Sequence, residues 1–122
     1  MRAKNDSVDL DALCPEMTRL APLIDVCYSA FEALAIVTAT TNGHHMAGSL
    51  HYRGLALDLR VKHLGSVARQ RSLYSCLKRN IDSLYPGLYD TLLEDSGGDN
   101  AHIHCEASPT LCAQIAGGVV PT

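Results

Sequence analysis

Ser49-Leu50-His51-Tyr52-Arg53-Gly54-Leu55-Ala56-Leu57-Asp58-Leu59-Arg60-Val61 is the stretch in which apolar and polar side chains begin to alternate. Successive side chains of a strand point to opposite faces, so residues 54–61 are predicted to form a strand with two unlike faces. A carboxylate in such a strand, if buried, requires a partner or a metal ion. One face carries Leu55, Leu57, Leu59 and Val61, and the other carries Asp58 and Arg60.

Three further strands are predicted around this one. Residues 35–40 are few and rich in β-branched side chains, which is typical of a buried strand. Residues 42–53 then form a loop, after a Thr-Asn-Gly turn signal. Farther along the chain, residues 89–94 and 101–106 flank a strong turn signal, Asp95-Ser96-Gly97-Gly98-Asp99-Asn100. These last two strands are therefore expected to form an antiparallel hairpin.

Two helices are predicted from apolar residues spaced three and four apart. The first pattern covers residues 15–34, but Pro22 interrupts it, so the firmer helix begins near Pro22 and residues 15–21 form a separate short turn. The second helix begins after Ser66, a favourable N-cap, and ends near Tyr85 before a Pro-Gly pair. The apolar stripes comprise Met17, Leu20, Ile24, Cys27, Tyr28, Phe31 and Leu34 in the first helix and Leu73, Leu77, Ile81 and Leu84 in the second.

These elements predict an α+β fold in which helices pack on one face of a small, mainly antiparallel sheet. The chain has 122 residues, which is the size of a single domain, and we expect a monomer. Residues 1–12 are expected to be a flexible N-terminal arm and residues 13–122 the folded domain, with a short helix around residues 111–116. The second face of the sheet would be free to carry a functional site.

The composition excludes several classes of protein. Hydrophobic residues make up 47% and charged residues 19% of the chain, which indicates a globular rather than a disordered protein. The net charge of −3, with no run of Lys or Arg, argues against a nucleic-acid partner. Asp25 and Glu32 interrupt the longest apolar stretch, so no membrane span is predicted. Residues 1–10 lack the apolar segment of a secretory signal, so synthesis in the cytoplasm is expected.

The five cysteines are odd in number and include no Cys-x-x-Cys pair. We expect them to be reduced thiols, most of them buried. Bridges between Cys14 and Cys27 or between Cys76 and Cys105 are compatible with the sequence, but the spacing argues for neither.

Four residues in two groups have side chains suited to a metal ion. His51 and Asp58 belong to the stretch quoted above, whereas His102 and His104 lie two apart in a predicted strand and so point to the same side. Zinc takes imidazole nitrogen and carboxylate oxygen, and a catalytic zinc site uses three protein ligands with one open position. The two groups converge if their strands are neighbours. Taken singly, a His-x-His pair is more often a surface feature of a strand, and His51 an ordinary loop residue.

The same residues carry a resemblance to a known family. Ser49-x-His51-x-x-Gly54-x-Ala56-x-Asp58-Leu59-Arg60, followed by His102-x-His104, resembles the zinc D-Ala-D-Ala carboxypeptidase family, which also includes phage endolysin peptidases and the hedgehog signalling domain. The segment Ala101-His102-Ile103-His104-Cys105 is similar to the hedgehog stretch, and residues 89–94 resemble small phage members. The resemblance covers about residues 15–107 and implies the hedgehog/DD-peptidase type of α+β fold.

The resemblance implies one Zn²⁺ bound by His51, Asp58 and His104. It also implies that His102 lies beside the metal and hydrogen-bonds the developing oxyanion. The resemblance also implies that Ser49 and Arg60 do not bind the metal themselves but support the residues that do, as metal sites commonly require.

The general base of the family is an acidic residue shortly before the last ligand, and two residues of this chain compete for that role. Glu94 keeps the residue type and the position at a strand end. Asp99 lies before His104 at the distance in sequence that the family's base has from its last ligand. This distance slightly favours Asp99 as the general base. An aspartate in a hairpin turn also has a purely structural explanation.

A cation of the family is missing from this chain. Many members have a Ser-x-x-Arg element after the strand that corresponds to residues 35–40, and here residues 38–45 contain no Arg. If that Arg steadies the substrate carboxylate or the oxyanion, another cation must replace it. The candidates are Arg53, Arg60 and a protonated His44 or His45.

The function implied by the resemblance is zinc-dependent hydrolysis of peptidoglycan stem peptides, at the D-Ala-D-Ala or the L-Ala-D-Glu bond. The absence of a signal peptide suits a phage lysis protein or tail component that reaches the cell wall after release. Three alternatives stay open: a non-catalytic domain stabilised by zinc, a phage structural module of the same fold, and a metal-independent α+β binding domain. Zinc retention and cleavage of stem peptides distinguish them.

Overall fold

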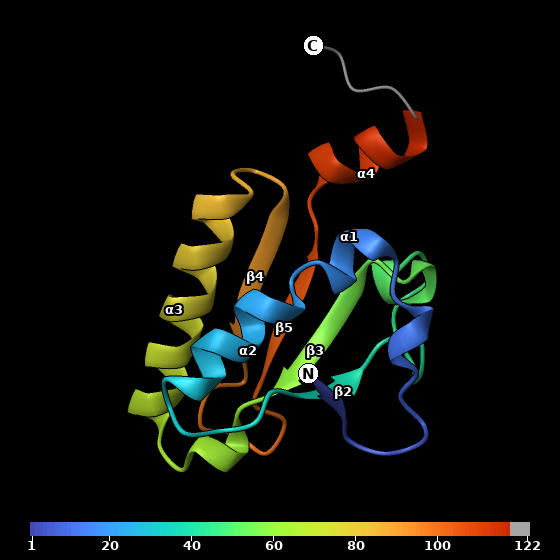
Figure 1. Ribbon diagram of the computed structural model, residues 1–122. Coiled ribbons are helices and arrows are strands. Elements are labelled where there is room, and N and C mark those ends of the chain that lie inside the picture. The colour runs from blue at the N-terminus through green and yellow to red at the C-terminus, as the bar shows by residue number, and fades with distance from the viewer. Residues whose placement is uncertain (118–122) are drawn as a thin grey trace.

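The computed structural model describes residues 1–117 and contains a five-stranded sheet (Figure 1). In space the strands follow the order β1-β2-β3-β5-β4. β1 pairs parallel to β2, and the remaining neighbours are antiparallel. The predicted α+β fold with a mainly antiparallel sheet is therefore confirmed, and so is the hairpin of β4 and β5. The strands are β1 (Arg2–Ala3), β2 (Ile36–Ala39), β3 (Ala56–Arg60), β4 (Tyr89–Glu94) and β5 (His102–Ala107).

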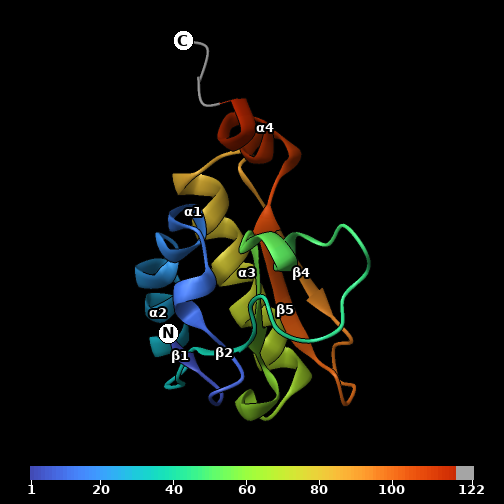
Figure 2. The same cartoon turned by 90° about the vertical axis from the view of Figure 1, so that its right-hand side faces the viewer.

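Helices cover one face of this sheet. Figure 2 shows α1 (Pro15–Thr18), α2 (Ala21–Ser29) and α3 (Val67–Leu84) on one side of the strands, and the loop between β2 and β3 on the other side. α4 (Pro109–Gly117) follows β5 at one end of the sheet, where a short helix was predicted. Residues 118–122 of the predicted tail lie outside the described residues. Within residues 1–117, none of the helices is both long enough and apolar enough to cross a bilayer. One-turn 3₁₀ helices lie in the connections: η1 (Leu10–Ala12), η2 (Leu50–Arg53) and η3 (Lys62–Leu64).

The hydrophobic core lies between the helices and the leucine face of β3. Leu57 and Leu59 are almost fully buried, whereas Asp58 and Arg60 on the other face are partly exposed, as the alternation predicts. The core face of β5 consists of Ile103, Cys105 and Ala107, so its histidines necessarily point the other way. The helices contribute Ile24, Cys27 and Tyr28 from α2 and Leu73, Leu77 and Ile81 from α3.

Residues 1–12 pack against the domain instead of forming a flexible arm. β1 adds a short strand beside β2, and Val8 is buried in the core. The hydroxyl of Thr40 also donates a hydrogen bond to the carbonyl of Asp9, at 2.9 Å. These contacts are made with residues about thirty positions farther along the chain, so the local polar composition of the segment could not predict them.

The predicted start of the second long helix at Ser66 is confirmed, but the predicted end of the first one is not. The Ser66 hydroxyl accepts a hydrogen bond from the Arg69 backbone N–H and so caps α3. The first helix, expected to reach Leu34, ends at Ser29, because the chain reverses at Glu32, whose φ is 55°. Leu34 is consequently 60% exposed. Leu84, expected in the buried stripe, is the last residue of α3 and is 64% exposed.

Candidate metal centre

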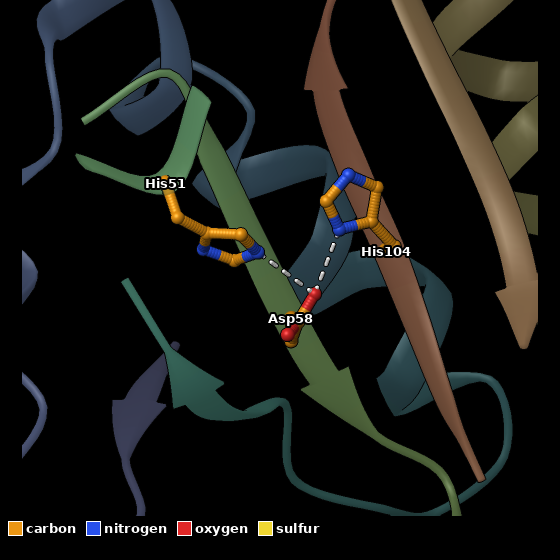
Figure 3. Close-up of side chains that lie close together, drawn as sticks. All are labelled: His51, Asp58 and His104. Atoms are coloured by element: carbon orange, nitrogen blue, oxygen red, sulfur yellow. Dashed lines mark hydrogen bonds and ion pairs between the residues drawn. The ribbon is translucent and has the colours of Figure 1, made fainter. Parts of the chain in front are cut away.

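Three side chains from separate elements converge on the open face of the sheet (Figure 3). Asp58 on β3 and His104 on β5 are direct register partners, so their side chains leave the same face side by side. His51 reaches them from η2, the one-turn helix that precedes β3. The Ser49 hydroxyl accepts a hydrogen bond from the His51 backbone N–H at 3.2 Å, and it thereby caps that turn.

Gly54 makes the return from η2 into β3. Its φ is 69°, in the left-handed region that favours glycine. A Cβ at this position would overlap the carbonyl oxygen of Ala12, and the backbone N–H of Cys14 donates to the Gly54 carbonyl at 2.9 Å. The sequence-based expectation that Gly54 permits a sharp turn and a close approach is therefore confirmed.

The three facing atoms have the spacing of a small cation site. His51 Nε2 lies 3.4 Å and His104 Nδ1 lies 2.9 Å from Asp58 Oδ1. All three atoms lie within 4.8 Å of one another. Ligands about 2.0–2.1 Å from a tetrahedral zinc are separated by roughly 3.3 Å, which is close to the first two distances. Two imidazoles and one carboxylate also form a donor set that zinc accepts, so these residues fit a divalent ion.

Hydrogen bonds behind the ligands fix which ring atoms face the centre. His51 Nδ1 donates to the backbone carbonyl of Thr40 at 2.7 Å, which leaves the lone pair of the neutral ring on Nε2. His104 Nε2 lies 2.7 Å from Glu106 Oε1, and its Nδ1 faces Asp58. Such outer partners orient metal-binding histidines and raise their basicity. Sequence reasoning missed Thr40 and Glu106; the spacing His-x-Glu on one strand face was the available signal for Glu106.

The electrostatics favour a charged, paired cluster. Burial alone would raise the pKa of Asp58, but hydrogen bonds to His104 and His51 outweigh it and hold the pKa well below its usual range. The hydrogen bond to Asp58 raises the pKa of His104 to about 9; burial opposes this shift, and Glu106 adds to it. In the metal-free protein the His104 ring is therefore a positively charged imidazolium at neutral pH, with a proton on each nitrogen. A metal ion would displace one of these two protons.

An open cavity of about 490 Å³ lies over the three residues. Its wall includes Glu94 and His102, which are register partners on β4 and β5. His102 Nε2 lies 3.5 Å from Glu94 Oε2, and His102 Nδ1 donates to the Asn100 carbonyl at 2.6 Å. His45 closes another side of the cavity, with its ring stacked on that of His51 at 3.9 Å. A titratable pair thus faces the same space as the three candidate ligands.

The remaining predicted residues lie farther from this cavity. Asp99 and Arg60 line a neighbouring cavity of about 510 Å³, which Asp58 also borders. The backbone carbonyl of Asp99 accepts a hydrogen bond from Lys62 Nζ at 2.8 Å. Arg53 is exposed and lines neither cavity, although its backbone carbonyl accepts a hydrogen bond from Cys14. The structure thus brings Glu94 and His102 to the three candidate ligands and leaves Arg53 apart from them.

Comparison of the chain with protein-family models, curated proteins and solved structures gives no match. The interpretation of this centre therefore depends on its residues and their geometry.

Proposed function

We propose that this protein is a zinc peptidase that hydrolyses peptidoglycan stem peptides at an L,D or D,D bond. The observation that carries the proposal is the arrangement of His51, Asp58 and His104 under an open cavity that also contains an acid–base pair. A zinc ion held by these three residues would supply a Lewis acid that polarises a peptide carbonyl and lowers the pKa of water. Release from a phage-infected cell to the wall is part of this proposal.

Glu94 is the general base in this proposal, in place of the slightly favoured Asp99. Its carboxylate faces the cavity of the three ligands, whereas Asp99 borders only the neighbouring cavity. Glu94 would accept a proton from the attacking water and deliver it to the leaving amine. His102, 3.5 Å away, can exchange a proton with Glu94 and donate from Nε2 to the developing oxyanion.

In this proposal Arg60 replaces the family's missing Arg as the cation that steadies the substrate carboxylate. It extends from the same face of β3 as Asp58 and lines the neighbouring cavity together with Lys4 and Lys62. Stem peptides are rich in free carboxylates, and a guanidinium binds a carboxylate well in a bidentate fashion. These cations therefore suit the acidic end of a substrate whose scissile bond lies over the three ligands.

The test combines metal analysis with digestion of purified muropeptides, followed by mass spectrometry. We expect about one zinc per chain and release of D-Ala or cleavage of the stem. Glu94→Gln should keep the zinc and lower the cleavage rate by roughly 10²–10⁴-fold, the usual contribution of a general base. Asp99→Asn is the matched control and should cleave at a rate close to that of the unmodified protein. Equal losses in both variants, or a loss in Asp99→Asn alone, would contradict the assignment of Glu94.

A second candidate function is a non-catalytic domain that zinc stabilises for binding. The lack of an Arg in residues 38–45, at the end of β2 and directly after it, favours this alternative. Zinc-loaded protein that leaves every muropeptide intact would support it over the peptidase.

A further inference from the structure

Two cysteine thiols meet on the helical side of the sheet, away from the metal centre. Cys27 on α2 and Cys76 on α3 are 49 positions apart in sequence, yet their Sγ atoms are 2.7 Å apart. That distance is within about 0.7 Å of the roughly 2.05 Å of a disulfide bond. The Asn80 side-chain amide lies 3.6 Å from Cys27 Sγ and 3.4 Å from Cys76 Sγ, so it holds both sulfurs from the same side.

We propose that Cys27 and Cys76 form a disulfide by exchange with an anionic low-molecular-weight disulfide, of which glutathione disulfide is the natural probe. The bond would join α2 to α3 and so fix the two main helices of the core layer to each other. This modification site is independent of the proposed peptidase function, because neither sulfur belongs to the metal centre.

The surface around Cys76 gives a reagent access to one sulfur only. Cys27 is 1% exposed, whereas Cys76 is partly exposed and lines a groove of about 510 Å³ along α3. Arg71 and Arg79 line the same groove, together with Phe31. Two guanidinium groups beside an accessible thiol complement the carboxylates of glutathione. The exchange therefore begins at Cys76.

The chemistry balances in two steps. The Cys76 thiolate, after loss of its proton to water, attacks one sulfur of glutathione disulfide, and a glutathione thiolate leaves. The Cys27 thiol then loses its proton and attacks the Cys76 sulfur of this mixed disulfide, and the second glutathione leaves. Two protein thiols are oxidised by two electrons in total, and one glutathione disulfide is reduced to two thiols.

The order of these steps follows from the surroundings of Cys27. Burial raises the pKa of Cys27 to about 12, with a further contribution from the neighbouring Cys76 thiol. A buried thiol that keeps its proton is a poor first nucleophile. It is well placed for the second step, since the sulfur it attacks is already its neighbour. The second step should consequently be the slower one and should accelerate as the pH rises.

The other cysteines are not arranged for this reaction. Within residues 1–117, Cys14 and Cys112 contact backbone carbonyls, of Arg53 and Ala107, rather than another thiol. Cys105 is 1% exposed and contacts the Thr91 hydroxyl. We therefore expect one specific disulfide and no mixture of pairings.

The experiment is to incubate the reduced full chain with glutathione disulfide, block the remaining thiols, and map tryptic peptides without reduction. Trypsin isolates Cys27 in residues 20–53 and Cys76 in residues 72–78, and neither peptide contains another cysteine. The expected result is a linked pair of these peptides, two hydrogen atoms lighter than their sum, and a melting temperature higher by on the order of 10 °C. Linkage of either cysteine to a different one, or a stable mixed disulfide at Cys76 with no linked pair at any pH up to 9, would overturn the proposal.

Variants in which one cysteine is replaced by serine provide the controls. Cys27→Ser should stop at the mixed disulfide on Cys76, and Cys76→Ser should leave Cys27 unmodified. Cys112→Ser is the matched control, because it removes a partly buried thiol that, within residues 1–117, contacts the Ala107 carbonyl rather than a sulfur, and it should still form the Cys27–Cys76 bond. Since the mapping is done on the unmodified chain, the outcome does not depend on whether a variant folds.

Discussion

The choice of ring nitrogen at each histidine depends on atoms that sequence patterns do not specify. His51 presents Nε2 because a backbone carbonyl, that of Thr40, binds Nδ1. His104 presents Nδ1 because Glu106, two residues along the same strand face, binds Nε2. The histidines and Asp58 could be predicted from residue type and spacing, whereas these partners follow only from the register of the strands and the course of the loop.

Glu106→Gln tests the supporting hydrogen bond at His104. Zinc must displace the proton of His104, whose pKa in the metal-free protein is about 9, so zinc affinity should rise with pH up to about 9 and level off above it. Without the Glu106 carboxylate that pKa is lower, and the plateau should begin at a lower pH. The plateau affinity itself should fall by roughly 10–100-fold. Competition titrations with a zinc indicator between pH 6 and 10 measure both quantities.

A purely structural role for Glu106 predicts a different result. The variant would then bind zinc more weakly by the same factor at every pH, with the plateau beginning where it does in the unmodified protein. An unchanged affinity and an unchanged profile would show that the contact with His104 has no effect on the metal.

At the scale of elements, local patterns predicted the strands better than the segments between them. Alternation in residues 54–61 and the turn signal before β5 are local features, and both strands are present where expected. The packing of residues 1–12 depends on pairing with β2, and the early end of α2 depends on the reversal at Glu32, so neither was visible in a short window of sequence. Two element boundaries were predictable from single residues: Gly54 between η2 and β3, and Ser66 at the start of α3.

Gly54→Ala should destabilise the fold by about 3 kcal/mol or more. A left-handed φ costs a residue with a Cβ roughly 1–2 kcal/mol, and overlap with the Ala12 carbonyl adds to that cost. Gly65→Ala is the matched control, because Gly65 also has a positive φ, of 88°, but its Cβ would meet nothing within 4 Å. Its cost should be limited to about 1–2 kcal/mol.

Urea denaturation of the two variants, compared with the unmodified protein, measures the difference in the free energy of unfolding. Zinc affinity should fall only in Gly54→Ala, because only that turn positions His51. Equal destabilisation by the two substitutions would contradict the close approach of Gly54 to Ala12.

For the molecule as a whole, the core and the candidate metal centre occupy opposite faces of one sheet. The leucine face of β3 is buried in the core together with residues of α2 and α3. On the other face, Asp58 already has hydrogen-bonding partners in His51 and His104, so its charge is compensated without a metal. The fold should therefore survive removal of the metal, although an ion would link η2, β3 and β5.

Chelation should lower the melting temperature without unfolding the protein at 25 °C. Free zinc at about 1,000 times its dissociation constant stabilises a protein by roughly 4 kcal/mol, which corresponds to a shift on the order of 10–20 °C for a domain of this size. Thermal melts followed by far-UV circular dichroism, with and without a chelator, measure the shift. His104→Ala should melt at the same temperature in both conditions, because it cannot complete the ligand set. Loss of the folded spectrum on chelation at 25 °C would mean that the helical face does not hold the fold alone, whereas an unchanged melting temperature of the unmodified protein would mean that the three side chains bind no metal.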